Sequence, residues 1–226
     1  GTIKKLWSWR ARDRDDLPES VRPLFGTTDD CRPVDGGKAI LISSSGGAAA
    51  LVERATGKTL WHARVPNAHG LEALPGGRII AASSLAKTGN RLMLFDRAQP
   101  DQLLWETPLH SAHGVVWDAK RQRLWALGHA ELRRYALKDW SSAVPSLTQE
   151  AVFKLPDEDG HDLSAVPNSD DLVVTTHHHV LLFDRAQAAF RKHPELGQRG
   201  RVKGVAIHPD TGRVAFTQAL DKQWWT

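Results

Sequence analysis

The stretch "AHGLEALPGGRIIAAS" at residues 68–83 decides the fold, because copies of it recur along the chain. Each copy has a polar marker residue, then a short apolar run, a turn and a second apolar run. The other copies are "AHGVVWDAKRQRLWALG" (112–128), "GHDLSAVPNSDDLVVTT" (160–176), "VKGVAIHPDTGRVAFTQ" (202–218) and, more distantly, "TDDCRPVDGGKAILISS" (28–44). The markers His69, His113, His161 and Lys203 are therefore separated by 44, 48 and 42 residues.

Repeats of this length are typical of propeller blades or of helical repeats. Each unit contains short runs of Val, Ile, Leu, Phe and Trp, separated by turns rich in Gly, Pro, Asp and Asn, which indicates strands. No long stretch of helical periodicity appears. In the second unit we expect strands at about 70–74, 78–83, 91–96 and 103–107. Four strands in one unit are the pattern of a propeller blade.

The sequence therefore predicts a single all-β domain, a five-bladed β-propeller of four-stranded antiparallel blades. The blades are expected at about 28–65, 66–109, 110–155, 156–199 and 200–226 together with 3–11. The last unit lacks an outer strand, and "IKKLWSWRA" (3–11) precedes the first blade. Pairing of this N-terminal strand into the last blade would remove two open sheet edges. The alternative is a fragment of a larger ring with six or seven blades.

The first strand of each propeller blade lines the central channel, so the marker residues are expected to form a ring. By alignment, Asp29 or, after a slip of one residue, Asp30 takes the position in the first blade. Histidine and aspartate are preferred ligands of divalent ions. We expect His69, His113 and His161, with Asp29 or Asp30, to bind Zn, Mn or Ca, and the small neighbours of the histidines to permit close backbone approach. The alternative is a structural role, with each histidine bonded to backbone.

Other residues are weaker candidates. Trp117 follows His113 by four residues and is expected to stack on a sugar, and Arg201 is expected to bind substrate near Lys203. The remaining tryptophans are interpreted as core residues between blades. The run "HHH" (177–179) would bind a ligand only through alternate residues if it lay on a strand.

Composition narrows the class of protein. The chain has 226 residues, 41% of them hydrophobic and 25% charged, which is enough apolar material for a sizeable core. No apolar run approaches the ~20 residues that span a bilayer. The single cysteine, Cys31, excludes an internal disulfide, and no motif for an organic cofactor is present. The net charge of +4 favours acidic partners. Without a basic block we expect no nucleic acid partner, and we expect a monomer.

The motifs "NAHGLEALPGG" (67–77), "ISSSGGAAALVERATGKTLW" (42–61) and "GHDLSAVP" (160–167) resemble those of an uncharacterised group of small bacterial propeller proteins. More distantly they are similar to the propeller polysaccharide lyases of the ulvan lyase and oligogalacturonate lyase type. The resemblance implies histidines at the channel mouth, sometimes with a divalent ion, that act on a uronate ring. His69 matches that role, with His113 and His161 as companions. The ulvan-type enzymes also use a tyrosine, whereas Tyr135 is expected on an outer strand here.

Three functions follow as hypotheses. The first is a lyase that acts on an acidic polysaccharide by β-elimination, with His69, His113 or Lys203 as catalytic groups. The second is a non-catalytic module that binds a glycan or a protein, in which the histidines are structural. The third is a metal-centred enzyme of another class, such as an oxygenase or a hydrolase. The sequence assigns no compartment, and a secreted or periplasmic protein whose leader has been removed is one expectation.

Overall fold

The computed structural model describes residues 4–220, which form an all-β structure. Four sheets are antiparallel and four-stranded, as predicted, and a fifth has two strands among the described residues. The first two sheets consist of β1 (Cys31–Val34), β2 (Ala39–Ser44), β3 (Ala48–Glu53), β4 (Thr59–Arg64) and of β5 (Ala68–Leu74), β6 (Arg78–Ser83), β7 (Arg91–Asp96), β8 (Leu103–Pro108). The others consist of β9 (Gly114–Asp118), β10 (Arg123–Leu127), β11 (Glu131–Lys138), β12 (Ser146–Lys154), of β13 (Leu163–Ala165), β14 (Asp171–Thr175), β15 (Val180–Asp184), β16 (Ala189–Lys192), and of β17 (Val202–Ile207), β18 (Val214–Gln218).

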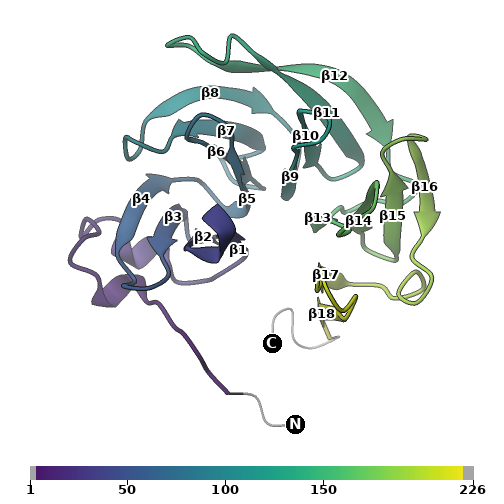
Figure 1. Ribbon diagram of the computed structural model, residues 1–226, viewed down its shortest axis with the longest axis horizontal. Helices are drawn as coiled ribbons and strands as arrows, with labels where there is room; N and C mark the ends of the chain where they lie inside the picture. Colours follow the sequence, from purple (N-terminus) through teal and green to yellow (C-terminus); the bar gives the residue numbers. More distant parts are fainter. Residues whose placement is uncertain (1–3, 221–226) are drawn as a thin grey trace.

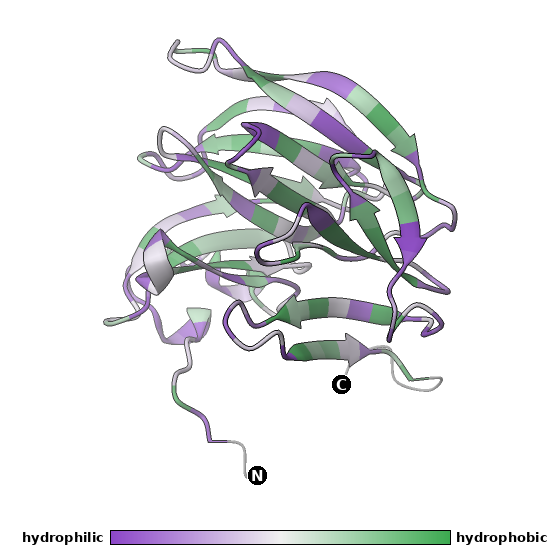
Figure 2. Ribbon diagram, turned by 45° about the vertical axis from the view of Figure 1, so that its right-hand side comes forward, coloured by the Kyte–Doolittle hydropathy of each residue, from purple (hydrophilic) through white to green (hydrophobic). Residues whose placement is uncertain are grey.

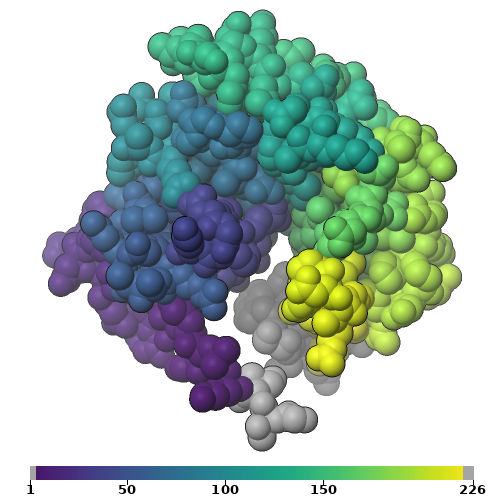
Figure 3. Space-filling model, viewed as in Figure 1, coloured from purple at the N-terminus to yellow at the C-terminus, as the bar shows by residue number. Residues whose placement is uncertain are grey.

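The sheets follow one another in chain order around a common centre (Figures 1 and 3). Within each complete sheet every strand pairs with the next strand of the chain, so that the first strand lies innermost and the fourth outermost (Figure 1). Repeated antiparallel sheets of this kind are compatible with a β-propeller. Among the described residues, no helix is long and apolar enough to cross a membrane.

Burial changes from the middle of each sheet to its outer edge. All six residues of β2 are buried, since this strand has neighbours on both edges and packed side chains on both faces. The fourth strand β4 alternates between buried and exposed residues instead. Figure 2 shows the apolar residues mainly on the strands and the hydrophilic residues concentrated in the turns. This pattern is the one expected when each sheet is covered by its neighbours.

The core lies between neighbouring sheets. Trp61 of the first sheet packs edge-on against Phe95 of the second, with ring centroids 5.6 Å apart. Trp125 of the third sheet contacts Phe183 of the fourth at 5.3 Å. Trp61 and Trp125 are both almost completely buried. The interpretation of these tryptophans as core residues between repeated units is therefore confirmed.

The N-terminal segment differs from the prediction. Residues 4–10 form no strand and do not pair with β17 or β18. Instead Trp7, Trp9 and Phe25 pack on an apolar face of the first sheet, which consists of Ile40, Ile42, Ala50 and Val52. The physical reason is that within residues 4–220 this face has no neighbouring sheet to bury it, and two indole rings supply the apolar cover. Residue 3 and residues 221–226 of the expected last blade lie outside the described residues.

Candidate functional site

Four marker side chains meet at the centre of the structure, and we refer to His69, His113, His161 and Lys203 as the axial cluster. The ring centroids of His69 and His113 are 4.3 Å apart, and those of His113 and His161 are 4.7 Å apart. The Nζ atom of Lys203 lies 2.6 Å from Nε2 of His161. Side chains from the second to the fifth sheets thus form one continuous group.

Glycines beside the histidines allow the inner strands to approach this closely. The amide of Gly70 donates to the carbonyl oxygen of His113 at 2.6 Å. A Cβ on Gly70 would lie 2.5 Å from that oxygen, and one on Gly114 would lie 2.5 Å from Cβ of Leu163. Since both distances are shorter than real Cβ contacts, neither position accommodates a side chain. The expected close backbone approach is therefore observed at these two glycines.

Asp29, not Asp30, joins the axial cluster. Oδ1 of Asp29 lies 3.5 Å from Nδ1 of His69, and Oδ2 of Asp29 accepts the amide of Ser45 at 2.5 Å. The carboxylate of Asp30 accepts the amide of Leu71 at 3.3 Å and lies 3.7 Å from a guanidinium nitrogen of Arg32. Asp29 therefore lies beside His69, whereas Asp30 lies beside Arg32.

A second group of polar contacts is centred on Arg32. Its Nη1 donates to Oε2 of Glu72 and to the carbonyl oxygen of Val115, each at 2.7 Å. Asp162, which directly precedes β13, is partly buried, and desolvation raises its pKa to about 6, although the charge of Arg32 opposes the shift. Arg32 therefore links the first sheet to the second and third sheets beside the axial cluster.

The imidazoles of the axial cluster are held neutral. Burial lowers the pKa of His69 and of His113 to about 4, and that of His161 to about 3. The positive charge of Lys203 lowers the pKa of all three further, because it opposes protonation of the imidazoles. Burial also lowers the pKa of Lys203, whereas Asp159 opposes that shift. At pH 7 the cluster thus presents three neutral rings beside an ammonium group.

The sequence analysis missed Asp159, which lies among three histidines from separate loops. Its Oδ2 is 3.5 Å from Nε2 of His161 and 3.5 Å from Nδ1 of His177, and its Oδ1 is 3.8 Å from Nδ1 of His129. Burial opposes ionisation of Asp159, but His161, the contact with His177 and the charge of Lys203 together lower its pKa. The signal for it was the acidic run "DEDGHD" (157–162), which surrounds the third marker histidine.

The triple-histidine run forms a bend between β14 and β15, not a strand. His178 contacts Asp157 at 3.0 Å, and Nδ1 of His179 lies 3.0 Å from the carbonyl oxygen of Gly197. Only His177 faces Asp159. The alternation expected for a strand therefore does not apply to residues 177–179.

The two predicted substrate-binding residues, Trp117 and Arg201, lie in different parts of the structure. Trp117 is near the far end of β9, about 13 Å along the strand from His113 at ~3.3 Å per residue. Its side chain packs on the core between the second and third sheets. Arg201 lies two residues before Lys203 and close to the axial cluster. Its amide donates to the carbonyl oxygen of His177, and its charge lowers the pKa of Lys203. The structure thus brings Arg201, but not Trp117, to the histidines.

Two ring nitrogens of the axial cluster are already engaged, and the predicted divalent ion stays a prediction. Among residues 4–220, no group of three or more His, Cys, Asp or Glu side chains is placed to hold a metal. Nε2 of His161 accepts from the ammonium group of Lys203, which would repel a cation at that nitrogen. Nδ1 of His113 lies 2.8 Å from the carbonyl oxygen of Ser111 and so is engaged as a donor.

The chain was compared with known proteins over its whole length. No curated protein matches it. A family model described as a family of unknown function (DUF6528) matches residues 1–225. That description carries no activity, so the resemblance to propeller lyases stays a prediction. The match covers nearly every residue, and the chain therefore belongs to this family of unknown function, DUF6528.

Proposed function

We propose that the chain is a five-bladed β-propeller whose axial cluster binds the acidic group of a uronate sugar and eliminates the glycosidic bond beside it. Support for the architecture comes from the five successive sheets and from inner strands that contact one another from β1 through β5, β9 and β13 to β17. In this proposal β17 and β18 belong to the fifth blade. Residues 4–10 cover the first blade and do not complete the fifth.

The observation that carries the functional proposal is the juxtaposition of Lys203 with three neutral imidazoles. An ammonium group pairs with a carboxylate, and neutral imidazoles donate and accept hydrogen bonds from sugar hydroxyls. The side chains of His69 and His161 are 24% and 14% exposed, so they are reachable but largely desolvated. Partial desolvation strengthens the attraction between a bound carboxylate and Lys203.

In the proposed reaction, Lys203 pairs with the uronate carboxylate and stabilises the negative charge that develops when the C5 proton leaves. Nε2 of His69 accepts this proton, since Nδ1 of the same ring faces Asp29. The electron pair of the C5–H bond becomes the C4–C5 double bond. The C4–O bond breaks, and the departing oxygen takes a proton from water. Asp29 stabilises the imidazolium of His69 that results.

The low pKa of His69 makes it a weak base in the free protein, and substrate binding counteracts this. A carboxylate beside the cluster adds a negative charge, which raises the pKa of each nearby imidazole. The proposed base therefore becomes stronger when an acidic substrate is bound. A neutral sugar would not produce this change, so the cluster would discriminate in favour of uronates.

The test is the ultraviolet absorbance of the unsaturated uronate product after incubation with a panel of acidic polysaccharides. We expect product with the wild type, and a loss of about 100-fold or more in His69→Gln, as for removal of a general base. Lys203→Met is expected to lose activity as well. His208→Asn is the matched control, because His208 lies in the turn between β17 and β18, outside the cluster. Absence of product with every polysaccharide would contradict the lyase.

The engaged ring nitrogens favour a second candidate, a non-catalytic module that binds acidic glycans. Nδ1 of His113 donates to the backbone, and Nε2 of His161 accepts from Lys203, as in a binding surface whose histidines are fixed in place. Calorimetry separates the two candidates. Binding of oligogalacturonate that Lys203→Met abolishes, without any product from the wild type, would favour the module.

A further inference from the structure

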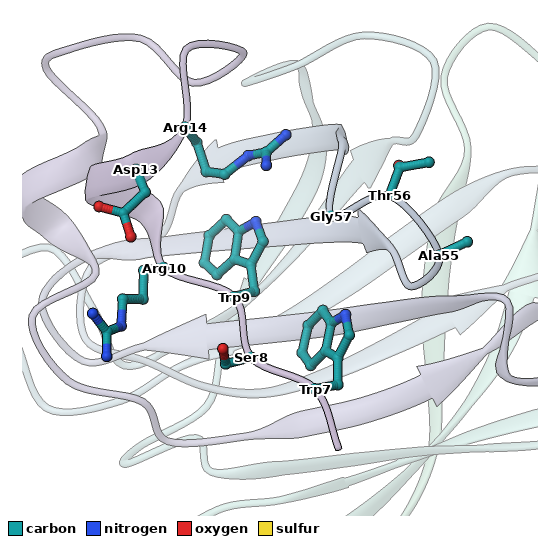
Figure 4. Close-up of a pocket in the computed structure, with 9 residues that line it drawn as sticks. All are labelled: Trp7, Ser8, Trp9, Arg10, Asp13, Arg14, Ala55, Thr56 and Gly57. Atoms are coloured by element: carbon teal, nitrogen blue, oxygen red, sulfur yellow. The ribbon is translucent and has the colours of Figure 1, made fainter. Parts of the chain in front are cut away.

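Apart from the axial cluster, a pocket lies between the N-terminal segment and the turn that joins β3 to β4. It has a volume of about 540 Å³ and is lined by Trp7, Ser8, Trp9, Arg10, Asp13, Arg14, Ala55, Thr56 and Gly57 (Figure 4). We call it the tryptophan pocket. In the register of the first sheet, Asp29 precedes β1 at one end, whereas the β3–β4 turn follows Glu53 at the other. The tryptophan pocket is thus remote from the axial cluster.

The two indole rings of the tryptophan pocket are held in place. Both project from the segment in the same direction (Figure 4) and pack on the apolar face of the first sheet. Nε1 of Trp7 donates to the carbonyl oxygen of Arg54 at 2.9 Å. The ring of Trp9 meets that of Phe25 edge-on, with centroids 5.3 Å apart. Both tryptophans remain half-buried, so each presents part of a fixed aromatic surface to the pocket.

The polar wall of the pocket is also ordered. Arg14 donates from Nε and Nη2 to the two carboxylate oxygens of Asp16, at 3.2 and 2.9 Å. Asp16 in turn accepts the amide and the hydroxyl of Thr59, at 2.9 and 3.0 Å. These donors lower the pKa of Asp16 to about 2, with Arg14 as the largest cause. The guanidinium of Arg14 is therefore fixed before any ligand arrives.

Gly57 keeps the space between these two walls open. A Cβ at this position would lie 3.4 Å from Nη1 of Arg14 and 3.7 Å from Cδ1 of Trp9, and the backbone has a φ of +73°. A side chain here would be strained and would fill the gap between the guanidinium and the indole. The absence of a side chain thus leaves a slot with one aromatic wall and one hydrogen-bonding wall.

We propose that the tryptophan pocket is a second, independent ligand site that binds a pyranose sugar. The apolar C–H face of such a ring would lie on an indole, as apolar surfaces do on aromatic side chains. Its hydroxyls would bond to Arg14, Arg10 and Asp13, which offer both donors and an acceptor. Since charges of both signs line the pocket, recognition rests on hydroxyl groups and does not need an acidic sugar. In this it differs from the axial cluster.

Calorimetric titration with a cello-oligosaccharide and with an oligogalacturonate tests this site. We expect the wild type to bind the neutral sugar with a Kd of roughly millimolar or tighter. Gly57→Asn is expected to weaken binding about tenfold or more, because the new side chain occupies the slot between Arg14 and Trp9 while both tryptophans remain, and asparagine tolerates the positive φ. Trp7→Ala should have a similar effect. Arg12→Ala is the control, since the side chain of Arg12 is 74% exposed and does not line the pocket.

The outcomes separate this site from the axial cluster. Retention of neutral-sugar binding in Lys203→Met supports the tryptophan pocket, even if the lyase assay fails. Loss of that binding in Lys203→Met, with wild-type affinity in Gly57→Asn, would place the sugar in the axial cluster and overturn the proposal. Absence of binding by the wild type to both sugars would overturn it too. Near-ultraviolet circular dichroism of Trp7→Ala checks that the first sheet stays folded.

Discussion

The ammonium group of Lys203 lies 2.6 Å from Nε2 of His161, so a cation from β17 is hydrogen-bonded to the imidazole that precedes β13. This contact joins the fourth and fifth sheets at the centre of the molecule. Burial is the largest cause of the low pKa of His161, about 3, and the neighbouring His113 and Lys203 add to it.

Removal of that ammonium should be visible in the titration of the histidines. In Lys203→Met we expect the pKa of His161 to rise by about 1 unit, because a nearby like charge no longer opposes protonation. His69 should shift in the same direction, since Lys203 also lowers its pKa. Imidazole proton shifts in NMR measure both. His193 is the internal control, because its lowered pKa comes from burial and does not involve Lys203.

Acid should destabilise the fold through the axial cluster. The folded-state pKa values of His69, His113 and His161 lie near 4, 4 and 3, below the unfolded value of 6.5. Between pH 6.5 and 4 the unfolded chain therefore binds more protons, and the free energy of unfolding falls as the pH falls. The expected loss is on the order of a few kcal/mol for each imidazole.

Asp162 acts in the opposite direction over part of this range. Its folded pKa of about 6 exceeds the ordinary value of 3.8, so its contribution to stability is present at low pH and is lost as the pH rises through 6. The three histidines contribute more than the one carboxyl, so the free energy of unfolding still increases with pH. Urea unfolding between pH 4 and 7 measures the slope, and His113→Gln should reduce it. A flat profile in the wild type would show that the imidazoles are not buried as described.

The glycine beside His69 should not tolerate a methyl group. In Gly70→Ala the new Cβ would meet the carbonyl oxygen of His113 at 2.5 Å, and backbone on both sides cannot yield easily. We expect a loss of about 1–3 kcal/mol in the free energy of unfolding. Gly204→Ala is the matched control at the equivalent position of β17, where the nearest atom is Oγ1 of Thr217 at 3.5 Å. Equal stability of the two variants would contradict the close contact of the inner strands.

Loss of Arg32 should be costly. In Arg32→Met the carboxylate of Glu72 loses its guanidinium partner, and the side chains of both residues are largely buried, at 20% and 16% exposure. We expect a destabilisation of about 3 kcal/mol, as for other broken buried ion pairs. The double variant Arg32→Met with Glu72→Gln should recover part of it, since no unpaired charge then remains. Urea unfolding of both variants gives the comparison, and an unchanged midpoint in Arg32→Met would refute a structural role for this pair.

Much of the fold was predictable from the repeat. The strands expected in the second unit, 70–74, 78–83, 91–96 and 103–107, correspond closely to β5–β8, because apolar runs and turn residues define each boundary. The meeting of His69, His113 and His161 followed from their equal positions in successive units. Turn glycines such as Gly76 and Gly77, both with φ near +70°, marked the end of β5 in the same way.

What the sequence did not predict depends on tertiary contacts. The alternation of Trp7 and Trp9 suits a strand, but where this segment packs depends on which sheet face lacks a cover. Asp159 lies in a loop, and loop conformation brings it to His129 and His177 without any periodic signal. Trp117 shares a strand with the cluster, yet its distance along β9 places its ring in the core.

The cover of the first sheet has a consequence for how the chain folds during synthesis. Trp7, Trp9 and Phe25 leave the ribosome before Ile40, Ile42, Ala50 and Val52, the surface on which they pack. At ~5–20 residues per second, these aromatic side chains wait for seconds without their docking surface. These aromatic side chains are therefore made before the surface that covers them, and they stay exposed until β2 and β3 have been synthesised.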